Sequence, residues 1–130
     1  MAALVTGCGA KSLNAKTFTD VAKDYGFSVT DSKAKANGMD KWIVGKDKHG
    51  GTVQFVSFKS SGSAGEFFKT QSKQISDQTG APSSGGTMST TYAGYYYYLT
   101  RKGDAVILAT VPSENTDAVK GLIQDLPDPE

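Results

Sequence analysis

Apolar side chains recur with the period of a helix in three segments of this chain, and strand-like runs lie between them. The first segment spaces its apolar residues i, i+3, i+4 and i+7 from Phe18 to Tyr25, which is typical of an amphipathic helix. A second segment follows Ser63, and a third follows Ser113 and ends at prolines. The pattern predicts three helices that begin near these positions.

The segments between the predicted helices have the composition of strands. Residues 41–46 and 52–58 are rich in β-branched and aromatic side chains, and so are residues 91–100 and 105–111. A short loop that contains glycine separates the two runs of each pair, which is typical of a hairpin. Residues 27–30 alternate in polarity and are compatible with a further short strand.

The order of elements is therefore α-ββ-α-ββ-α. Hairpin strands pair antiparallel, and amphipathic helices need an apolar surface to cover. We expect an α+β fold, a two-layer sandwich in which all three helices lie on one face of a four-stranded antiparallel sheet, with 27–30 as an optional fifth strand. Helix starts recur about every 50 residues, which indicates a weak internal αββ repeat. Residues 17–130 are expected to form one domain, preceded by a polar tether within 1–16.

Cys8, the only cysteine of the chain, closes the run Leu4-Val5-Thr6-Gly7-Cys8. A small apolar run that ends in a tiny residue before cysteine is similar to the lipobox that bacterial lipoprotein signal peptidase cleaves. The seven residues before Cys8 are shorter than an export signal, so either the native start has been trimmed or the likeness is accidental. With lipid on Cys8, the protein would be extracytoplasmic and anchored to the outer face of the cytoplasmic membrane.

The composition of the chain limits which partners and which kinds of stabilisation are expected. The chain carries 14 basic and 13 acidic residues, a formal net charge of +1, which argues against a nucleic-acid partner. A single cysteine cannot form an intramolecular disulfide, so core packing must hold the fold together. No apolar run after Cys8 approaches the roughly 20 residues that a membrane-spanning helix needs.

The chain offers little material for catalysis or metal binding. His49, the only histidine, falls in the loop of the first hairpin, far in sequence from Cys8. No glycine-rich motif matches a nucleotide-binding fingerprint, so we expect neither a metal site nor a cofactor. The carboxylate pairs Asp20 with Asp24 and Asp117 with Asp125 are typical of solvated helix faces. We therefore expect no enzymatic activity.

Four consecutive tyrosines stand out. In a strand, Tyr96 and Tyr98 point to one face while Tyr95 and Tyr97 point to the other. Helices on one face would leave one of these pairs open, and the sequence does not decide which. Aromatic cross-strand pairs can serve sheet stability alone, or they can form a binding surface together with neighbouring aromatic residues. The candidate binding surface comprises Tyr95, Tyr96, Tyr97, Tyr98, Trp42 and Phe58.

The chain resembles small lipoproteins of Gram-positive, largely gut-dwelling bacteria. The resemblance rests on Tyr25-Gly26-Phe27 followed by Val29-Thr30-Asp31, and on a hairpin strand that leads into the helix near residues 64–68. It continues with the Ser/Gly-rich crossover, the tyrosine-rich strand, a Gly-Asp turn and the helix near residues 119–126. It implies an extracytoplasmic address and the fold expected above, and it carries no catalytic residues.

These observations favour a lipid-anchored binding or scaffold module whose ligand is a protein, a peptide or a glycan. An inhibitor or immunity-type protein that blocks an envelope or secreted enzyme is the alternative, and a small hydrolase is the least favoured. A homodimer through the open sheet face would also bury the tyrosines.

Overall fold

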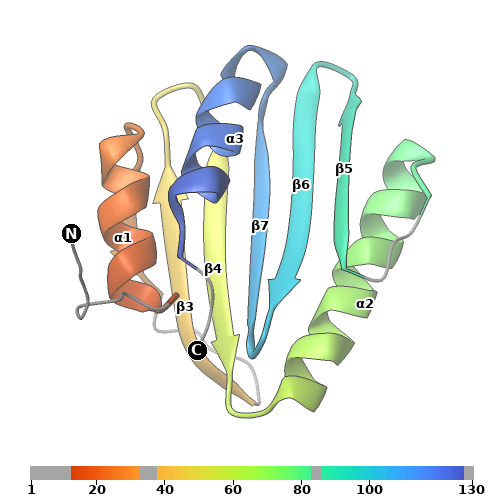
Figure 1. The fold of residues 1–130 in the computed structure, drawn as a ribbon. Coiled ribbons are helices and arrows are strands. Elements are labelled where there is room, and N and C mark those ends of the chain that lie inside the picture. The colour runs from red at the N-terminus through yellow and green to blue at the C-terminus, as the bar shows by residue number, and fades with distance from the viewer. Residues whose placement is uncertain (1–12, 33–37, 83–85, 128–130) are drawn as a thin grey trace.

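The computed structural model describes residues 13–32, 38–82 and 86–127. Its centre is a six-stranded antiparallel sheet in the order β2-β3-β4-β7-β6-β5 (Figure 1). Two three-stranded meanders meet where β4 pairs with β7. The elements are α1 (Ala15–Asp24), β2 (Ser28–Asp31), β3 (Met39–Lys46), β4 (Thr52–Phe58), α2 (Ser61–Thr79), β5 (Thr87–Tyr92), β6 (Tyr95–Lys102), β7 (Ala105–Pro112), a 3-10 turn η1 (Ser113–Asn115) and α3 (Thr116–Asp125).

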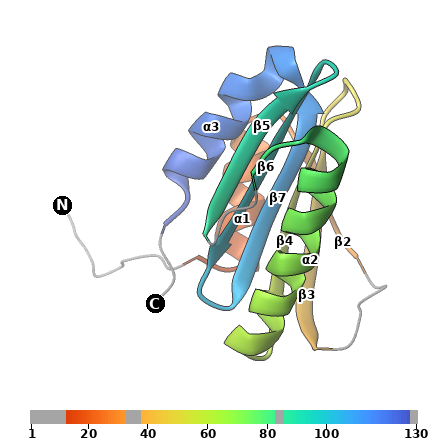
Figure 2. The ribbon, with the colours of Figure 1, turned by 90° about the vertical axis from the view of Figure 1, so that its right-hand side faces the viewer.

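Helices cover both faces of the sheet. Figure 2 shows α1 and α3 on one side and α2 on the other. We call the side of α1 and α3 the front face and the side of α2 the back face. The α+β class, the antiparallel sheet and the three helices are as predicted, but the prediction that all helices lie on one face is wrong.

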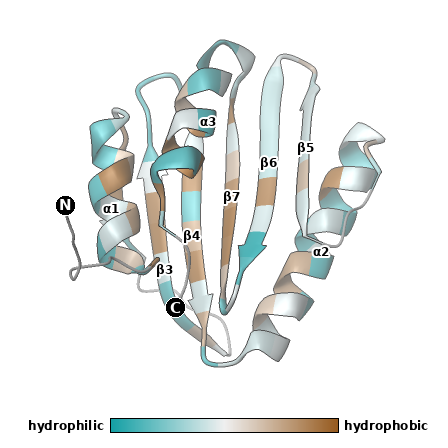
Figure 3. Cartoon of the chain, in the orientation of Figure 1, coloured by the Kyte–Doolittle hydropathy of each residue, from teal (hydrophilic) through white to brown (hydrophobic). Residues whose placement is uncertain are grey.

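The reason lies in the two central strands, which are apolar on both sides. In β4, Phe55 faces the front cluster and Val56 the back cluster, and in β7 the same holds for Ile107 and Val106. Strands with two apolar faces need cover on both. Figure 3 shows that hydrophobic residues, coloured brown, are concentrated on the middle strands of the sheet.

The strand count differs from the predicted four or five. The optional strand near 27–30 exists as β2, and a sixth strand, β5, precedes the tyrosines. A tight turn separates β5 from β6, with Ala93 at φ 52° and Gly94 at φ 84°. Alanine rarely adopts positive φ, so the sequence gives a weak turn signal here and 91–100 looks like one strand.

Helix α1 begins earlier than predicted. Asn14 caps it, because its side-chain oxygen accepts from the Thr17 N–H at 2.9 Å while the Thr17 hydroxyl accepts from the Asn14 N–H. Leu13 is buried in the front cluster. Residues 13–16 are therefore part of the fold and not of a tether. Helix α2 ends at Thr79, and Gly80 is its C-cap with φ 78°.

The hairpin of β6 and β7 turns at Gly103–Asp104, so Leu99 pairs with Leu108 and Tyr97 with Thr110. We expected a turn at Lys102–Gly103, which would place Leu99 opposite Val106. The difference is two residues, and a shift by two keeps every side chain on its face. The predicted division of the tyrosines between the faces is therefore correct.

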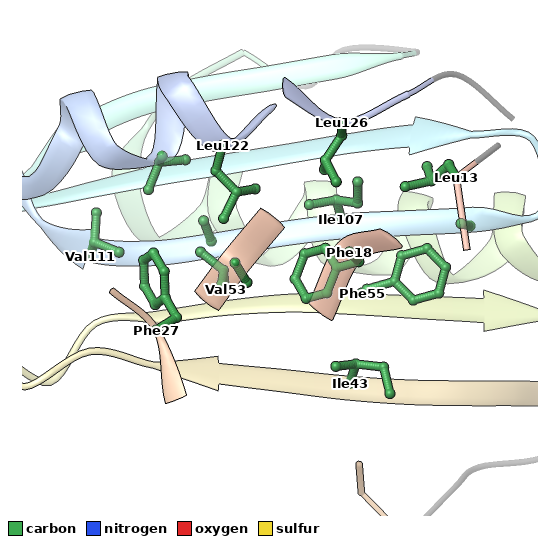
Figure 4. Close-up of a cluster of buried hydrophobic side chains, with 14 of the residues drawn as sticks. Leu13, Phe18, Phe27, Ile43, Val53, Phe55, Ile107, Val111, Leu122 and Leu126 are labelled. Atoms are coloured by element: carbon green, nitrogen blue, oxygen red, sulfur yellow. The ribbon is translucent and has the colours of Figure 1, made fainter. Parts of the chain in front are cut away.

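Two clusters of buried side chains hold the layers together. In the front cluster, the rings of Phe18 and Phe55 stack with centroids 5.5 Å apart, and Leu122 of α3 packs nearby (Figure 4). In the back cluster, Phe58 of β4 meets Phe67 of α2 with ring centroids 5.3 Å apart. The order α-β-β-β occurs twice, but α1 and α2 cover opposite faces.

Candidate binding surface

The four consecutive tyrosines differ in exposure within each face as well as between the faces. On the front face Tyr96 is 6% exposed and Tyr98 is half-buried. On the back face Tyr97 is half-buried and Tyr95 is 42% exposed. Each face is covered only in part, so neither pair is simply the open one.

Phe58 and Tyr96 belong to the core. Phe58 is 7% exposed and packs against Phe67 of α2. Tyr96 lies in the front cluster, opposite Val111 of β7. Neither side chain can contribute substantially to an exposed surface. Both residues were included in the predicted binding surface because the sequence could not show that helices cover both faces of the sheet.

Trp42 lies on the back face of β3 and is half-buried. Its indole Nε1–H donates to the side-chain oxygen of Gln54 on β4 at 2.8 Å. This hydrogen bond fixes the ring beside the amide and satisfies the indole donor. An aromatic surface and a polar amide therefore lie together on the part of the back face toward β2 and β3.

A second aromatic group lies at the far end of the same face. Tyr92 ends β5, is 48% exposed and pairs directly with Tyr95 of β6. Tyr97 follows on β6 with Thr90 on one side and Thr110 on the other. Side chains of directly opposite residues on a sheet are in contact range, so Tyr92 lies beside Tyr95, and Tyr97 lies between two threonines.

We call this part of the back face, which borders the cluster under α2, the aromatic strip. It is uncharged, and it combines rings with hydroxyl and amide groups. Helix α2 packs on the remainder of the face, over Val56, Leu99 and Val106. The sequence indicated Trp42, Tyr95 and Tyr97 but not the other members, since their proximity depends on the pairing of distant strands. The strip comprises Trp42, Gln54, Thr110, Tyr97, Tyr95 and Tyr92.

Asp47, in the loop before the exposed His49, has a structural role. One carboxylate oxygen accepts from the backbone N–H of His49 at 2.8 Å and of Gly51 at 2.7 Å. The other accepts from the Asn115 side chain at 2.8 Å. Burial raises the pKa of Asp47, but the hydrogen bonds from Gly51, Asn115 and His49 outweigh it and lower the pKa below its usual range. This carboxylate stabilises the loop and its contact with Asn115.

A hollow of about 800 Å³ lies beside α2, away from the strip. Arg101 contributes to its wall and donates to the backbone oxygens of Ser61 at 3.1 Å and Gly103 at 3.2 Å. Lys69 and Glu66 also line the hollow. The charges there are mixed and exposed, so they define no ligand charge.

Within residues 13–32, 38–82 and 86–127, no group of three or more His, Cys, Asp and Glu side chains could hold a metal ion. No helix in this part of the chain has the length and apolarity needed to cross a bilayer. Cys8 lies outside the described residues.

Comparisons with protein-family models, with curated proteins and with solved structures find no match to this chain. The resemblance to small lipoproteins of Gram-positive bacteria therefore stays a prediction from the sequence.

Proposed function

We propose that this protein is a lipid-anchored, extracytoplasmic binding module that recognises a folded protein through the aromatic strip. The observation that carries the proposal is that Tyr97, Tyr95 and Tyr92 lie together on the back face outside the cluster that α2 covers, with Trp42 half-buried at the border of that cluster. Lipid on Cys8 supplies the membrane attachment in this proposal, as the lipobox-like run before it suggests.

A protein partner fits the strip better than a small molecule does. Small-molecule sites are concave and enclose most of the ligand, whereas the strip lies on a sheet surface. Tyrosine and tryptophan supply large contact areas at low conformational cost, and hydroxyl and amide groups add adaptable hydrogen bonds. The strip carries no charge, so we expect an affinity that depends little on salt.

Site-specific photocrosslinking in a Gram-positive host tests the surface. A photoreactive phenylalanine analogue at position 97 should crosslink one envelope or secreted protein. The matched control places the analogue at position 98, the adjacent residue on the opposite face, and should give no such product. Equal crosslinking from both positions, or none from position 97, would contradict the proposal.

The membrane attachment has its own test. The intact mass of membrane-extracted protein, expressed with its complete N-terminus, should include diacylglyceryl on Cys8. The variant Cys8→Ser should lose both the added mass and the membrane fraction. An unmodified chain in the cytosol would remove the anchor from the proposal.

The inhibitor or immunity-type alternative uses the same surface with an enzyme as partner. It remains a prediction, and identification of the crosslinked protein separates it from a scaffold role.

A further inference from the structure

The strand β5 is an unprotected edge of the sheet. Its six residues pair with β6 without a register shift, and they include no charge and no proline. The opposite edge, β2, has four residues and carries Asp31. Exposed edges are usually protected by charges, prolines or bulges, because their free backbone groups can pair with another strand. The edge at β5 lacks these protections.

The pairing with β6 shows which backbone groups of β5 are available. The Arg101 N–H donates to the Gly86 oxygen at 3.2 Å, so Gly86 and Arg101 form a hydrogen-bonded pair. Such pairs alternate along an antiparallel ladder. The backbone groups of Met88, Thr90 and Tyr92 therefore point toward β6. Those of Thr87, Ser89 and Thr91 point outward, and these three residues are exposed.

We propose that β5 pairs antiparallel with β5 of a second copy of this chain, about a two-fold axis at Ser89. This register places Ser89 opposite Ser89 of the second copy, and Thr87 opposite Thr91. All outward backbone groups then meet outward groups, which provides about six hydrogen bonds. On the front face the opposing side chains are hydroxyl against hydroxyl, so the strand is complementary to itself.

The ends of the strand fit the same register. Tyr92 lies opposite Gly86 of the second copy, and both positions are on the back face. A Cβ built at Gly86 meets nothing within 4 Å, and Tyr92 is 48% exposed, so a ring can lie over the glycine. Aromatic side chains across from edge glycines are a known way to stabilise strand pairs.

The position of α2 is compatible with a partner strand that extends the sheet beyond β5. Figure 1 shows the C-terminal half of α2 extending beyond β5, and Figure 2 places that helix behind the back face. An added strand would lie on the side toward which α2 extends. A second copy is favoured over an unrelated extended peptide because the pairing around Ser89 is symmetric in residue type.

Sedimentation equilibrium of the purified full chain tests this interface. The weight-average mass should rise with concentration from 13.7 kDa toward twice that value. Ser89→Lys alone and Ser89→Glu alone should each raise the dimer dissociation constant at least about tenfold, since like charges would meet across the axis. An equimolar mixture of the two variants should restore the dimer.

The control is Thr30→Lys, an exposed position on the opposite edge strand, which should leave the dimer unchanged. Ser89→Pro is a second variant, because its nitrogen points away from β6 and proline is tolerated at such edge positions. This variant should also remain monomeric in sedimentation equilibrium. A wild-type mass that stays at 13.7 kDa, a Ser89→Lys variant that still dimerises, or a mixture that stays monomeric would overturn the proposal. So would a wild type that binds an extended peptide along β5 but not a second copy.

Discussion

Asp47 shows how one side chain organises a whole corner of the molecule. Its carboxylate accepts hydrogen bonds from the backbone N–H groups of His49 and Gly51 in the loop and from the side chain of Asn115. Asn115 is the residue directly before α3. A loop between two strands is thereby connected to a helix that begins far along the chain. The sequence suggested a turn at this loop but gave no sign of the contact with Asn115.

The depressed pKa of Asp47 leads to a pH-dependent contribution to stability. Because the pKa of the folded state lies below the unfolded value of about 3.9, the ionised group stabilises the fold above that pH. The contribution is lost as the pH falls through the lower folded-state pKa. We expect Asp47→Asn to reduce the free energy of unfolding by about 1 kcal/mol at pH 7, and by less near pH 3.

Urea unfolding of both proteins at the two pH values checks this expectation. Asp31→Asn, at an exposed position on the edge strand β2, is the control for a simple change of charge. A destabilisation by Asp47→Asn that stays the same at pH 3 would contradict the proposed role of the carboxylate.

At the scale of elements, the central observation is that the sheet is covered from both sides. Helix α2 buries Ala64 and Phe68 against Leu99 and Val106 on the back face. Without α2, these strand residues would face water. The helix is therefore important to stability, because it keeps this face of the sheet out of water.

Phe68→Ala measures that importance. A fully buried phenylalanine lost to alanine costs about 3–5 kcal/mol, from lost transfer energy and the cavity that remains. Phe67→Ala is the matched variant one residue away, at a half-buried position, and should cost about 1–2 kcal/mol. Thermal or urea unfolding gives both values. Equal, small effects would show that α2 is not packed on the sheet as described.

Local patterns in the sequence predicted the elements well and their arrangement less well. The spacing from Phe18 to Tyr25 predicts a helix, and the run of β-branched and apolar residues at 105–111 predicts a strand, because both are local properties. The face on which a helix packs is not local. It follows from the pairing of β4 with β7, which makes Val56 and Val106 neighbours on the back face. The turn at Ala93 was missed because alanine is unusual at positive φ.

In the candidate site, too, local properties could be predicted from the sequence and tertiary properties could not. The alternation of Tyr95 to Tyr98 divided the rings correctly into two pairs on opposite faces, even with the register two residues off. Exposure could not be predicted, because it depends on which helices cover each face. Tyr96 is therefore buried, and Tyr92 belongs to the surface although nothing local in the sequence pointed to it.

For the molecule as a whole, the account combines two surfaces with different tasks. The aromatic strip on the back face is proposed to bind a folded protein, and the edge of β5 is proposed to bind a second copy. Tyr92 belongs to both surfaces, but the positions tested are separate, since Tyr97 lies on β6 and Ser89 on the outer strand. A dimer would present two strips on one continuous sheet, which would increase avidity for a partner with repeated sites.

The most direct test of the central claim is the affinity of the crosslinked partner protein for three purified chains, measured by isothermal titration calorimetry. We predict that Tyr97→Ala weakens binding at least about tenfold relative to the wild type, as expected for an aromatic residue at the centre of an interface. Tyr98→Ala, at the neighbouring position on the front face, should change it less than about twofold, with folding of both variants confirmed by circular dichroism. Unchanged affinity for Tyr97→Ala, or a larger loss for Tyr98→Ala, would contradict the assignment of the strip as the binding surface.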